Sequence, residues 1–453
     1  MAEFEKLISQ ISNIIWGYPL LILLFGTHIF LTFKLKFIQR YTGKAIKLSL
    51  QRSEEGEGDV SQFGALTTAL AATIGTGNIV GVSTAVAAGG PGAVFWMWLT
   101  GVFGIATKYA EALLAVKYRV KTKDGLMAGG PMYVLERGMK KKWLAVLFAA
   151  LMAFTAFGIG NMVQANSVSM MLRETFSVPP WMTGIVVALL VGSVILGGIK
   201  KISKVCEMLV PFMAIFFVVG NLILLALRFS TLFDSIWLIL KSAFIGANPI
   251  IGGFIGASFK EAIRFGAARG LFSNESGMGS APIVAAAAQT KNPTRQALVS
   301  SSGTFWDTVV MCAITGIVIV NCGYWTKGLD GAALTKATFD DIPVLGPLVL
   351  AVGLLTFVFA TIIAWSYYGE KAAEYLFGAK VVLPYRWAWV IMVFVGSILS
   401  LPIVWSFADV ANGIMIIPNL VSLILLSGVV VQETKEYLWD GEKRSEPGAD
   451  EKR

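Results

Sequence analysis

Charged residues, cysteine and histidine are all scarce in this sequence. Only 14% of the 453 residues are Asp, Glu, Lys or Arg, whereas soluble proteins contain about 25%. Three cysteines exclude a disulfide-stabilised scaffold, and fifteen prolines exclude a proline-rich disordered chain. A single histidine, His28, leaves no Ser/His/Asp triad, and the sequence has no HExxH motif and no phosphate-binding loop. These absences argue against an enzyme.

Apolar residues, by contrast, are abundant. They make up 56% of the chain, and the mean hydropathy is +0.70. A soluble protein of this length needs a more polar surface, so the composition predicts a protein embedded in a lipid bilayer. The net charge of +9 does not indicate a nucleic-acid partner, because lysine and arginine lie between apolar runs instead of forming one patch.

Apolar runs long enough to cross a membrane recur along the chain. A spanning helix needs about 20 mainly apolar residues. The sequence therefore predicts an all-α, polytopic membrane protein with eleven transmembrane helices, at residues 16–34, 64–90, 93–117, 143–173, 179–199, 205–228, 245–271, 296–322, 345–369, 385–402 and 404–432. The charged segment 433–453 is predicted to be a cytoplasmic tail.

The distribution of basic residues predicts the orientation of these helices. If the N-terminus lies outside, segments on the inner side hold 30 of the 37 lysines and arginines, and segments on the outer side hold six. Lysine and arginine are enriched in cytoplasmic loops. The sequence thus predicts a multi-pass cell-membrane protein with an external N-terminus and a cytoplasmic C-terminus.

Two of the expected helices contain clusters of glycine. The second reads LTTALAATIGTGNIVGVSTAVAAGG, and the seventh reads NPIIGGFIGASFKEAIRFGAARG. Glycines four residues apart can mark close helix packing, and Gly77 with Gly81 fits that alternative. The dense Gly-Thr-Gly-Asn and Gly-Gly clusters instead favour segments in which the helix unwinds.

The positions of these two helices predict an internal repeat. Without the N-terminal helix they are the first and sixth of ten helices, so each begins one half of five helices. Consecutive halves with an odd number of helices have opposite topology. We therefore expect an extra helix and a cytoplasmic loop at 1–62, a first repeat at 63–230, an inverted second repeat at 231–432, and a tail at 433–453.

An unwound segment in the middle of a membrane exposes peptide groups that lipid cannot satisfy. Such a break persists where it lines a cavity or binds a ligand. Amide N–H groups after the break suit a carboxylate, and carbonyl oxygens before it suit a small cation such as a sodium ion. The predicted carboxylate donors are the amides of Thr76 and Gly77, and the predicted cation ligands are the carbonyls of Ala71 and Ile74.

Several sequence blocks resemble one family of transporters. ATIGTGNIVG at 72–81 and GGPGAVFWMWLTGVFG at 89–104 are similar to the signature of the alanine/glycine:cation symporter family. AIRFGAARGLFSNESGMGSAPIVAAAA at 262–288 and TIIAWSYYGEKA at 361–372 resemble further blocks of that family. The resemblance covers nearly all of the core. It implies a fold of the leucine-transporter type, with five plus five helices, and sodium-driven uptake of alanine or glycine.

The resemblance also assigns substrate contacts. Residues 75–78 resemble the break in the first core helix of that fold, which places the substrate carboxylate at Thr76 and Gly77, next to Asn78. The glycine cluster of the sixth core helix adds a second group of predicted substrate contacts, namely Gly252, Gly253 and Phe254.

A sodium site is implied in the same region. The carbonyls of Ala71 and Ile74 would bind the ion together with the hydroxyl of Thr361 from the eighth core helix. The residue before Thr361 is an alanine where the fold has a second hydroxyl, so one ligand is missing or replaced. A second sodium site is implied near Thr73 and Asn78.

Other polar and aromatic residues are candidates for the pocket. Asn161 and Gln164 lie three residues apart, on one helical face. They either link helices or contact the ammonium group of the substrate. Trp365 lies four residues after Thr361, so it either shapes a small pocket or packs at an interface.

Ionisable residues within the apolar runs need partners. Lys108 and Glu111 are three residues apart and are expected to form a structural pair. Asp307 and Asp409 have no basic residue nearby in the sequence: either could be a gate, a proton site or a cation site, or could be hydrogen-bonded to backbone or Trp N–H groups. The sixth core helix is expected to carry an inner gate at its cytoplasmic end, formed by Arg264 and Arg269 with Glu261 or Glu275.

Other functional classes fit the sequence less well. A proton-coupled amino-acid transporter that uses Asp307 or Asp409 as its proton carrier is the closest alternative. An ion channel would need a pore-lining ring, and no repeated pattern supplies one. The sequence indicates no particular oligomeric state. The leading prediction is a sodium-coupled symporter of alanine or glycine.

Overall fold

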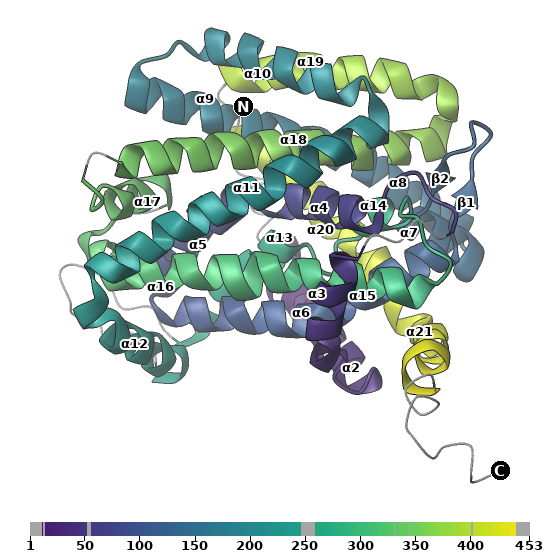
Figure 1. Ribbon diagram of the computed structural model, residues 1–453, viewed down its shortest axis with the longest axis horizontal. Helices are drawn as coiled ribbons and strands as arrows, with labels where there is room; N and C mark the ends of the chain where they lie inside the picture. The colour runs from purple at the N-terminus through teal and green to yellow at the C-terminus, as the bar shows by residue number, and fades with distance from the viewer. Residues whose placement is uncertain are drawn as a thin grey trace.

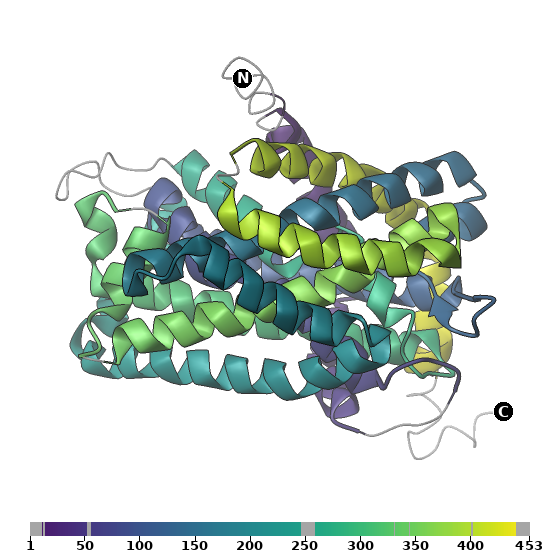
Figure 2. The ribbon, with the colours of Figure 1, turned by 90° about the horizontal axis from the view of Figure 1, so that it is seen from above.

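The chain folds into a bundle of helices with very little β-structure. The computed structural model describes residues 11, 14–51, 56–245, 259–329, 331–343, 345–399 and 402–440. Within these residues, strands β1 (Val120–Lys121) and β2 (Met127–Ala128) form one antiparallel hairpin at one end of the bundle (Figure 1, Figure 2). The described structure confirms the all-α prediction.

Short connections join the helices. The label α marks an α-helix, and the label η marks a 3-10 or π-helical segment. The first part of the chain contains α2 (Tyr18–Lys34), η1 (Ile38–Tyr41), α3 (Thr42–Ser49), α4 (Gln62–Thr73), η2 (Gly77–Gly81), α5 (Val82–Gly89), α6 (Gly92–Lys117), α7 (Pro131–Tyr133), η3 (Val134–Gly138), α8 (Lys142–Thr155), η4 (Ala156–Met162), α9 (Val163–Phe176), α10 (Pro180–Ile195), α11 (Gly198–Leu227) and η5 (Phe229–Thr231). The second part contains α12 (Leu232–Ile245), α13 (Phe259–Asn274), α14 (Pro282–Ala285), α15 (Pro293–Thr304), η6 (Phe305–Cys312), α16 (Ala313–Cys322), η7 (Tyr324–Lys327), α17 (Gly331–Phe339), α18 (Gly346–Phe377), η8 (Ala379–Val381), α19 (Val382–Ile398), α20 (Pro402–Leu425), α21 (Ser427–Thr434) and η9 (Lys435–Trp439).

Local sequence signals decide where several helices begin and end. The Ser61 hydroxyl accepts a hydrogen bond from Gly64 N at 2.8 Å and caps α4. The Asn292 side chain caps α15, which begins with a proline. α18 ends at Gly378, whose φ of 78° lies in the region that glycine adopts without strain. Caps therefore mark the beginnings of α4 and α15, and a glycine marks the end of α18.

The helices are long and apolar enough for a membrane. Within the described residues, six helical segments pass this test, and up to nine do so if each of three bent pairs is one span. Several large apolar side chains on the outer surface are 67% to 74% exposed: Leu189, Met208, Phe233 and Trp237. Such a surface suits contact with lipid. These features agree with a polytopic membrane protein, while the count of eleven helices remains a prediction.

One end of the bundle is closed by contacts between distant segments. This hairpin end comprises residues 56–62, 117–128 and 286–295. Val60 and Ala288 form a parallel bridge, and a Cβ added at Gly58 would lie 2.3 Å from Gln289 N. Four main-chain carbonyls accept hydrogen bonds of 2.8–3.0 Å from the Arg119 guanidinium: those of Glu57, Ala286, Ala288 and Thr290. The hairpin end is therefore tied together mainly through its backbone.

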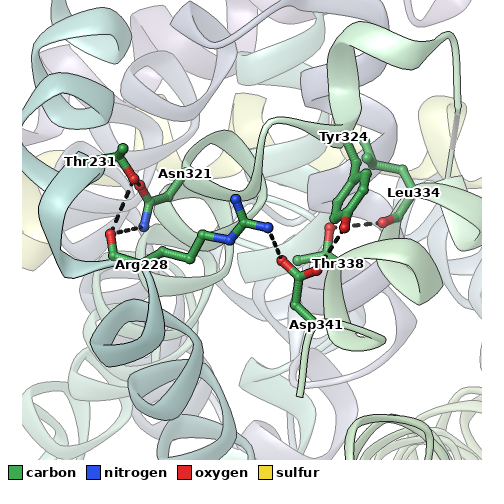
Figure 3. Close-up of polar contacts among 7 residues, drawn as sticks. All are labelled: Arg228, Thr231, Asn321, Tyr324, Leu334, Thr338 and Asp341. Atoms are coloured by element: carbon green, nitrogen blue, oxygen red, sulfur yellow. Dashed lines mark hydrogen bonds and ion pairs between the residues drawn. The ribbon is translucent and has the colours of Figure 1, made fainter. Parts of the chain in front are cut away.

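The opposite end is held by side chains. This α17 end comprises residues 228–235 and 321–343. Arg228 forms an ion pair with Asp341 at 2.7 Å, and Tyr324 donates to the other oxygen of Asp341 at 2.6 Å (Figure 3). Asn321 donates to the carbonyl of Arg228 at 3.1 Å. The hydrogen bond to Asp341 raises the pKa of the Tyr324 phenol, because it stabilises the protonated form.

The helices are interrupted in both halves of the chain. α4 is bent by 52° relative to η2 and α5, at the Gly-Thr-Gly-Asn cluster where the sequence predicts unwinding. In the second half, α13 ends at Asn274, and residues 275–281 have no regular helix before α14. The sequence predicts this second break at Gly252, Gly253 and Gly256, with Phe254 as a neighbouring substrate contact, and these residues lie outside the described residues. The break that the structure describes lies at 275–281, beyond that cluster.

The later position of this helix corrects the predicted inner gate. The first turn of α13 lies against the end of α5, where Glu261 O is 3.1 Å from a Cβ added at Gly89. That end of α5 is remote from the hairpin end, where α4 begins. Arg264 and Arg269 therefore lie on the α17 side of the break and not at the predicted inner end. The prediction was wrong because it placed the charged residues of this helix at its cytoplasmic end, whereas they precede the break at 275–281.

Candidate functional site

A cavity lies where the two helix breaks approach α18. The empty space between its walls, open solvent included, is about 350 Å³. It is lined by Ala72, Thr73, Gly75, Thr76, Gly77, Ile159, Gln164, Phe272, Ser273, Glu275, Met278, Thr361 and Trp365. Several predicted site residues are among them: Thr73, Thr76, Gly77, Gln164, Thr361 and Trp365. The structure thus brings together residues that are up to 292 positions apart in the chain.

Gly75 and Asn78 build the first break. The helix stops at Ile74, whose ψ is 88°. The Asn78 side-chain oxygen accepts a hydrogen bond from Gly75 N at 3.0 Å, and Asn78 N donates to Gly75 O at 3.2 Å. The first N–H groups of the helix that resumes after the break, including that of Gly77, have no acceptor within that helix. They are available to an anionic group in the cavity.

Thr361 lies at the end of α4, where the sequence places a cation. Its hydroxyl donates to the carbonyl of Ala71 at 3.0 Å, and the side chain is buried. Gly75 allows this approach, because a Cβ there would lie 2.8 Å from the Thr361 hydroxyl. Ile74, whose carbonyl is the third predicted ligand, is buried at the same helix end. Oxygen atoms of the kind a sodium ion binds are therefore close together.

Asn78 is bonded to Asp307, behind the cavity lining. Its side-chain nitrogen donates to Asp307 Oδ1 at 2.7 Å. The other carboxylate oxygen, Oδ2, accepts hydrogen bonds from Ser273 at 3.0 Å and from Thr308 at 2.6 Å. Asn78 and Asp307 are both fully buried. This cluster links the first break to α13 and η6.

Asn161 and Gln164 have different surroundings despite their shared helical face. Gln164 lines the cavity, and its side-chain oxygen accepts a hydrogen bond from the Thr76 hydroxyl at 3.3 Å. Asn161 instead donates to the carbonyl of Trp389 on α19 at 2.9 Å and is not among the lining residues. Its position supports the helix-linking alternative.

Trp365 forms an aromatic wall of the cavity. It packs so closely on Gly160 that a Cβ added there would lie 2.4 Å from the Trp365 Cβ and Cγ atoms. Ile159, Phe272 and Met278 add further apolar surface. A cavity with these walls favours a ligand with a small apolar side chain.

The second break supplies residues that the sequence reading missed. Phe272, Ser273, Glu275 and Met278 line the cavity, but none was predicted as a substrate contact. The segment SNESGMGSAP at 273–282 contains two glycines and a proline, the same kind of signal that marks the first break. The glycines and proline of 273–282 therefore predict this break as directly as the Gly252/Gly253 cluster predicts an earlier one.

Comparison with known proteins shows what kind of protein contains this cavity. Residues 1–451 match the model of a family described as the sodium:alanine symporter family. The chain belongs to this family. Its members are transporters and not enzymes, which agrees with the expectation from the sequence.

Relatives and one solved structure extend the match. The sodium/alanine symporter AgcS of Methanococcus maripaludis is 51% identical over 446 residues, covering 96% of this chain and 97% of AgcS. The probable sodium/glutamine symporter GlnT of Bacillus subtilis is 35% identical, covering 96% and 90%. The crystal structure of MhsT in complex with L-phenylalanine is 15% identical with a TM-score of 0.60, covering 84% of this chain and 94% of MhsT. This likeness shows a leucine-transporter-type fold.

Buried charges in this member of the sodium:alanine symporter family do not pair as the sequence predicts. No ion pair joins Lys108 and Glu111 among the described residues, and the Lys108 ammonium has no hydrogen-bond partner there. Glu111 instead accepts hydrogen bonds from Gly279 N at 3.0 Å and Asn419 at 2.7 Å. Lys108 and Glu111 thus interact electrostatically without a close ion pair, and backbone and amide donors from the second break and α20 reach the Glu111 carboxylate.

Asp409 does have a basic neighbour. It interacts electrostatically with Arg269, which lies on α13 and is far away in the sequence. The fold therefore supplies a partner that the local sequence does not show. Asp307, by contrast, has no ion pair among the described residues.

Proposed function

We propose that the protein is a secondary transporter that couples sodium entry to uptake of a small neutral amino acid, alanine or glycine. The observation that carries this proposal is the cavity at the first break, which Thr76, Gly77 and Thr361 line and where the Thr361 hydroxyl donates to the Ala71 carbonyl. Membership of the sodium:alanine symporter family and the likeness to AgcS support the same substrate and ion.

The substrate carboxylate binds at the amides of Thr76 and Gly77. These amides begin the helix after the break, where the helix dipole is positive and the N–H groups lack partners. The walls formed by Trp365 and Phe272 leave room for a small side chain. Gln164 hydrogen-bonds Thr76 and keeps the loop in position.

The sodium ion binds at the carbonyls of Ala71 and Ile74 and the hydroxyl of Thr361. In the structure this hydroxyl donates to Ala71 O, so it must rotate to direct its lone pairs at an ion. A second coupling cation has a place near Thr73, Asn78 and Asp307, where Asp307 supplies negative charge. If a proton is the cation that drives transport at Asp307, the protein is the proton-coupled transporter that the sequence offers as an alternative.

The membrane arrangement follows the sequence-based expectation. The N-terminus lies outside, the C-terminus is cytoplasmic, and the transporting core consists of the halves 63–230 and 231–432. The hairpin end then faces the cytoplasm. Its backbone contacts support a form that is closed on that side.

Uptake into proteoliposomes tests the proposal. An inward sodium gradient should drive saturable accumulation of radiolabelled alanine, and glycine should compete. Accumulation driven by a proton gradient without sodium would favour the proton-coupled alternative. Uptake of glutamine without alanine would contradict the proposed substrate. An alanine-independent conductance would indicate a channel.

A further inference from the structure

Glu275 lines the cavity, and no other ionisable residue is among the described lining residues. We propose that its carboxylate binds the ammonium group of the transported amino acid. This inference rests on the proposed function and adds a specificity-determining residue to it. The sequence pattern assigns a place only to the substrate carboxylate, whereas a free amino acid also carries a positive charge.

The hydrogen bonds of Glu275 leave one carboxylate oxygen available. Oε2 accepts a hydrogen bond from the Ser280 hydroxyl, whereas Oε1 has no partner among the described residues. The side chain is only 3% exposed in total. An oxygen without a donor from the protein, on a residue that lines the cavity, is free to accept a hydrogen bond from a ligand there.

Asp307 cannot take this role in the same way. One of its oxygens accepts a hydrogen bond from Asn78, and the other accepts two, from Ser273 and Thr308. It is fully buried and is not among the lining residues. Of these two carboxylates, Glu275 is the one that a substrate in the cavity can reach.

The resident cation near Glu275 does not contact it. Lys108 interacts electrostatically with Glu275, but no ion pair within 4.0 Å joins them among the described residues. Lys108 acts on Glu111 and Asp307 as well. One lysine therefore interacts with three buried carboxyl groups. An ammonium group bound at Glu275 would add a second positive charge near them.

The backbone at Glu275 supports a functional reason for this residue. Its φ is 55°, in the left-handed region, and its N–H donates to Leu271 O at 3.1 Å just after α13. Glycine is the usual residue at this position of a helix end, because it adopts the conformation without strain. A glutamate held there at a cost in strain points to a role for its side chain.

Together the two breaks form a cavity with opposite poles. The amides of Thr76 and Gly77 provide a positive pole on the first break, and the Glu275 carboxylate provides a negative pole on the second. A zwitterionic α-amino acid matches both poles. A carboxylic acid without an ammonium group matches only the first.

Binding measurements on Glu275→Gln test the inference. The variant keeps the size of the side chain and removes its charge. With saturating sodium, we expect the alanine Kd of the purified protein to rise about 10- to 100-fold, the loss typical of a charged hydrogen bond. Weak competition by propionate, which lacks the ammonium group, should be unchanged.

Two further variants separate binding from folding. Glu275→Gly removes the backbone strain, so its melting temperature should be at least that of the wild type while its alanine affinity falls as in Glu275→Gln. Glu111→Gln is the matched control, because Glu111 is a buried carboxylate near Lys108 that does not line the cavity. Its alanine affinity should change little.

The possible results distinguish this inference from the proposed function. If wild-type protein binds alanine and Glu275→Gln binds it equally well, the inference is overturned and the function stands. The same holds if Glu275→Gln loses its sodium response but keeps its alanine affinity at saturating sodium, because the carboxylate would then serve the ion. If wild-type protein binds no α-amino acid, both proposals fail together.

Discussion

Thr361 shows how a single hydroxyl can join two parts of the transport site. It comes from the middle of α18, and its hydrogen bond to Ala71 O reaches the last turn of α4. In the proposed mechanism an ion replaces this direct bond and pulls the same two helices together. The residue therefore acts on the position of the first break as well as on the ion.

Replacing Thr361 with alanine tests this role. Thr361→Ala removes one oxygen ligand, so the sodium concentration for half-maximal alanine uptake should rise several-fold, about 3- to 10-fold, with a smaller change in maximal rate. Thr361→Ser keeps the hydroxyl and is the matched control. An unchanged sodium requirement in Thr361→Ala would remove the residue from the ion site.

The position of a single residue in the cavity can be predicted where the residues next to it in the sequence determine the backbone conformation. Thr76 and Gly77 lie directly after a glycine that breaks the helix, so their place in the cavity follows from local sequence. Asn161 illustrates the opposite case. Its helical face contains Gln164, yet it bonds to α19, and only the packing of that helix decides this.

At the scale of elements, main-chain groups of the hairpin end hold distant segments together, and we call this set of contacts the hairpin latch. Residues 56–62 precede the first interrupted helix, and residues 286–290 follow the second, so the bridge between Val60 and Ala288 joins the two broken helices at this end. Arg119, at the end of α6, ties both segments through four carbonyls. In the proposed mechanism, opening of the cavity toward the hairpin end breaks these bonds.

We expect Arg119→Lys to loosen this latch. A lysine has three donors on one nitrogen, whereas the planar guanidinium reaches four carbonyls from two nitrogens. Hydrogen exchange at residues 286–290 should therefore become faster by about tenfold, whereas exchange in α11 should not change. Lys121→Gln, at an exposed lysine of the same hairpin, is the control. Equal exchange in all three proteins would show that Arg119 does not hold the latch.

The second break shows why element boundaries were harder to predict than element types. The described residues contain a second interrupted helix, at 275–281, whereas the break that the sequence predicts at Gly252 and Gly253 lies outside them. The sequence ended this helix at 271 and assigned its charged residues to a cytoplasmic end, whereas α13 continues to Asn274 and its first described turn lies against the end of α5. The charges of Lys260 and Arg264 are compatible with their place in α13 because of how the helix packs in the folded protein, and hydropathy carries no information about that packing.

At the scale of the whole molecule, composition and hydropathy were sufficient for the fold class, and sequence blocks were sufficient for the family. The contacts of the buried charged residues could not be predicted from composition, hydropathy or sequence blocks. Glu275 and Lys108 are separated by 167 positions, and no local pattern relates them. Which buried charges lack partners depends on how the two halves pack, so it required the structure.

Orientation in the membrane is the remaining whole-molecule prediction. Moving Lys260, Arg264 and Arg269 to the outer side changes the split from 30:6 to 27:9, so the segments assigned to the inner side, which include the hairpin end, still hold most of the lysines and arginines. The positive-inside rule therefore still places the hairpin end in the cytoplasm. The absolute orientation can be measured at one exposed residue from each end.

Cysteine labelling in intact cells provides this measurement. The native cysteines Cys206, Cys312 and Cys322 are buried, so they should react slowly with a membrane-impermeant maleimide. Asp124→Cys, at the exposed tip of the hairpin, should be labelled only after the membrane is permeabilised, whereas Lys327→Cys, exposed at the α17 end, should be labelled directly. The reverse pattern would invert the topology, and the hairpin latch would then close the external side of the cavity.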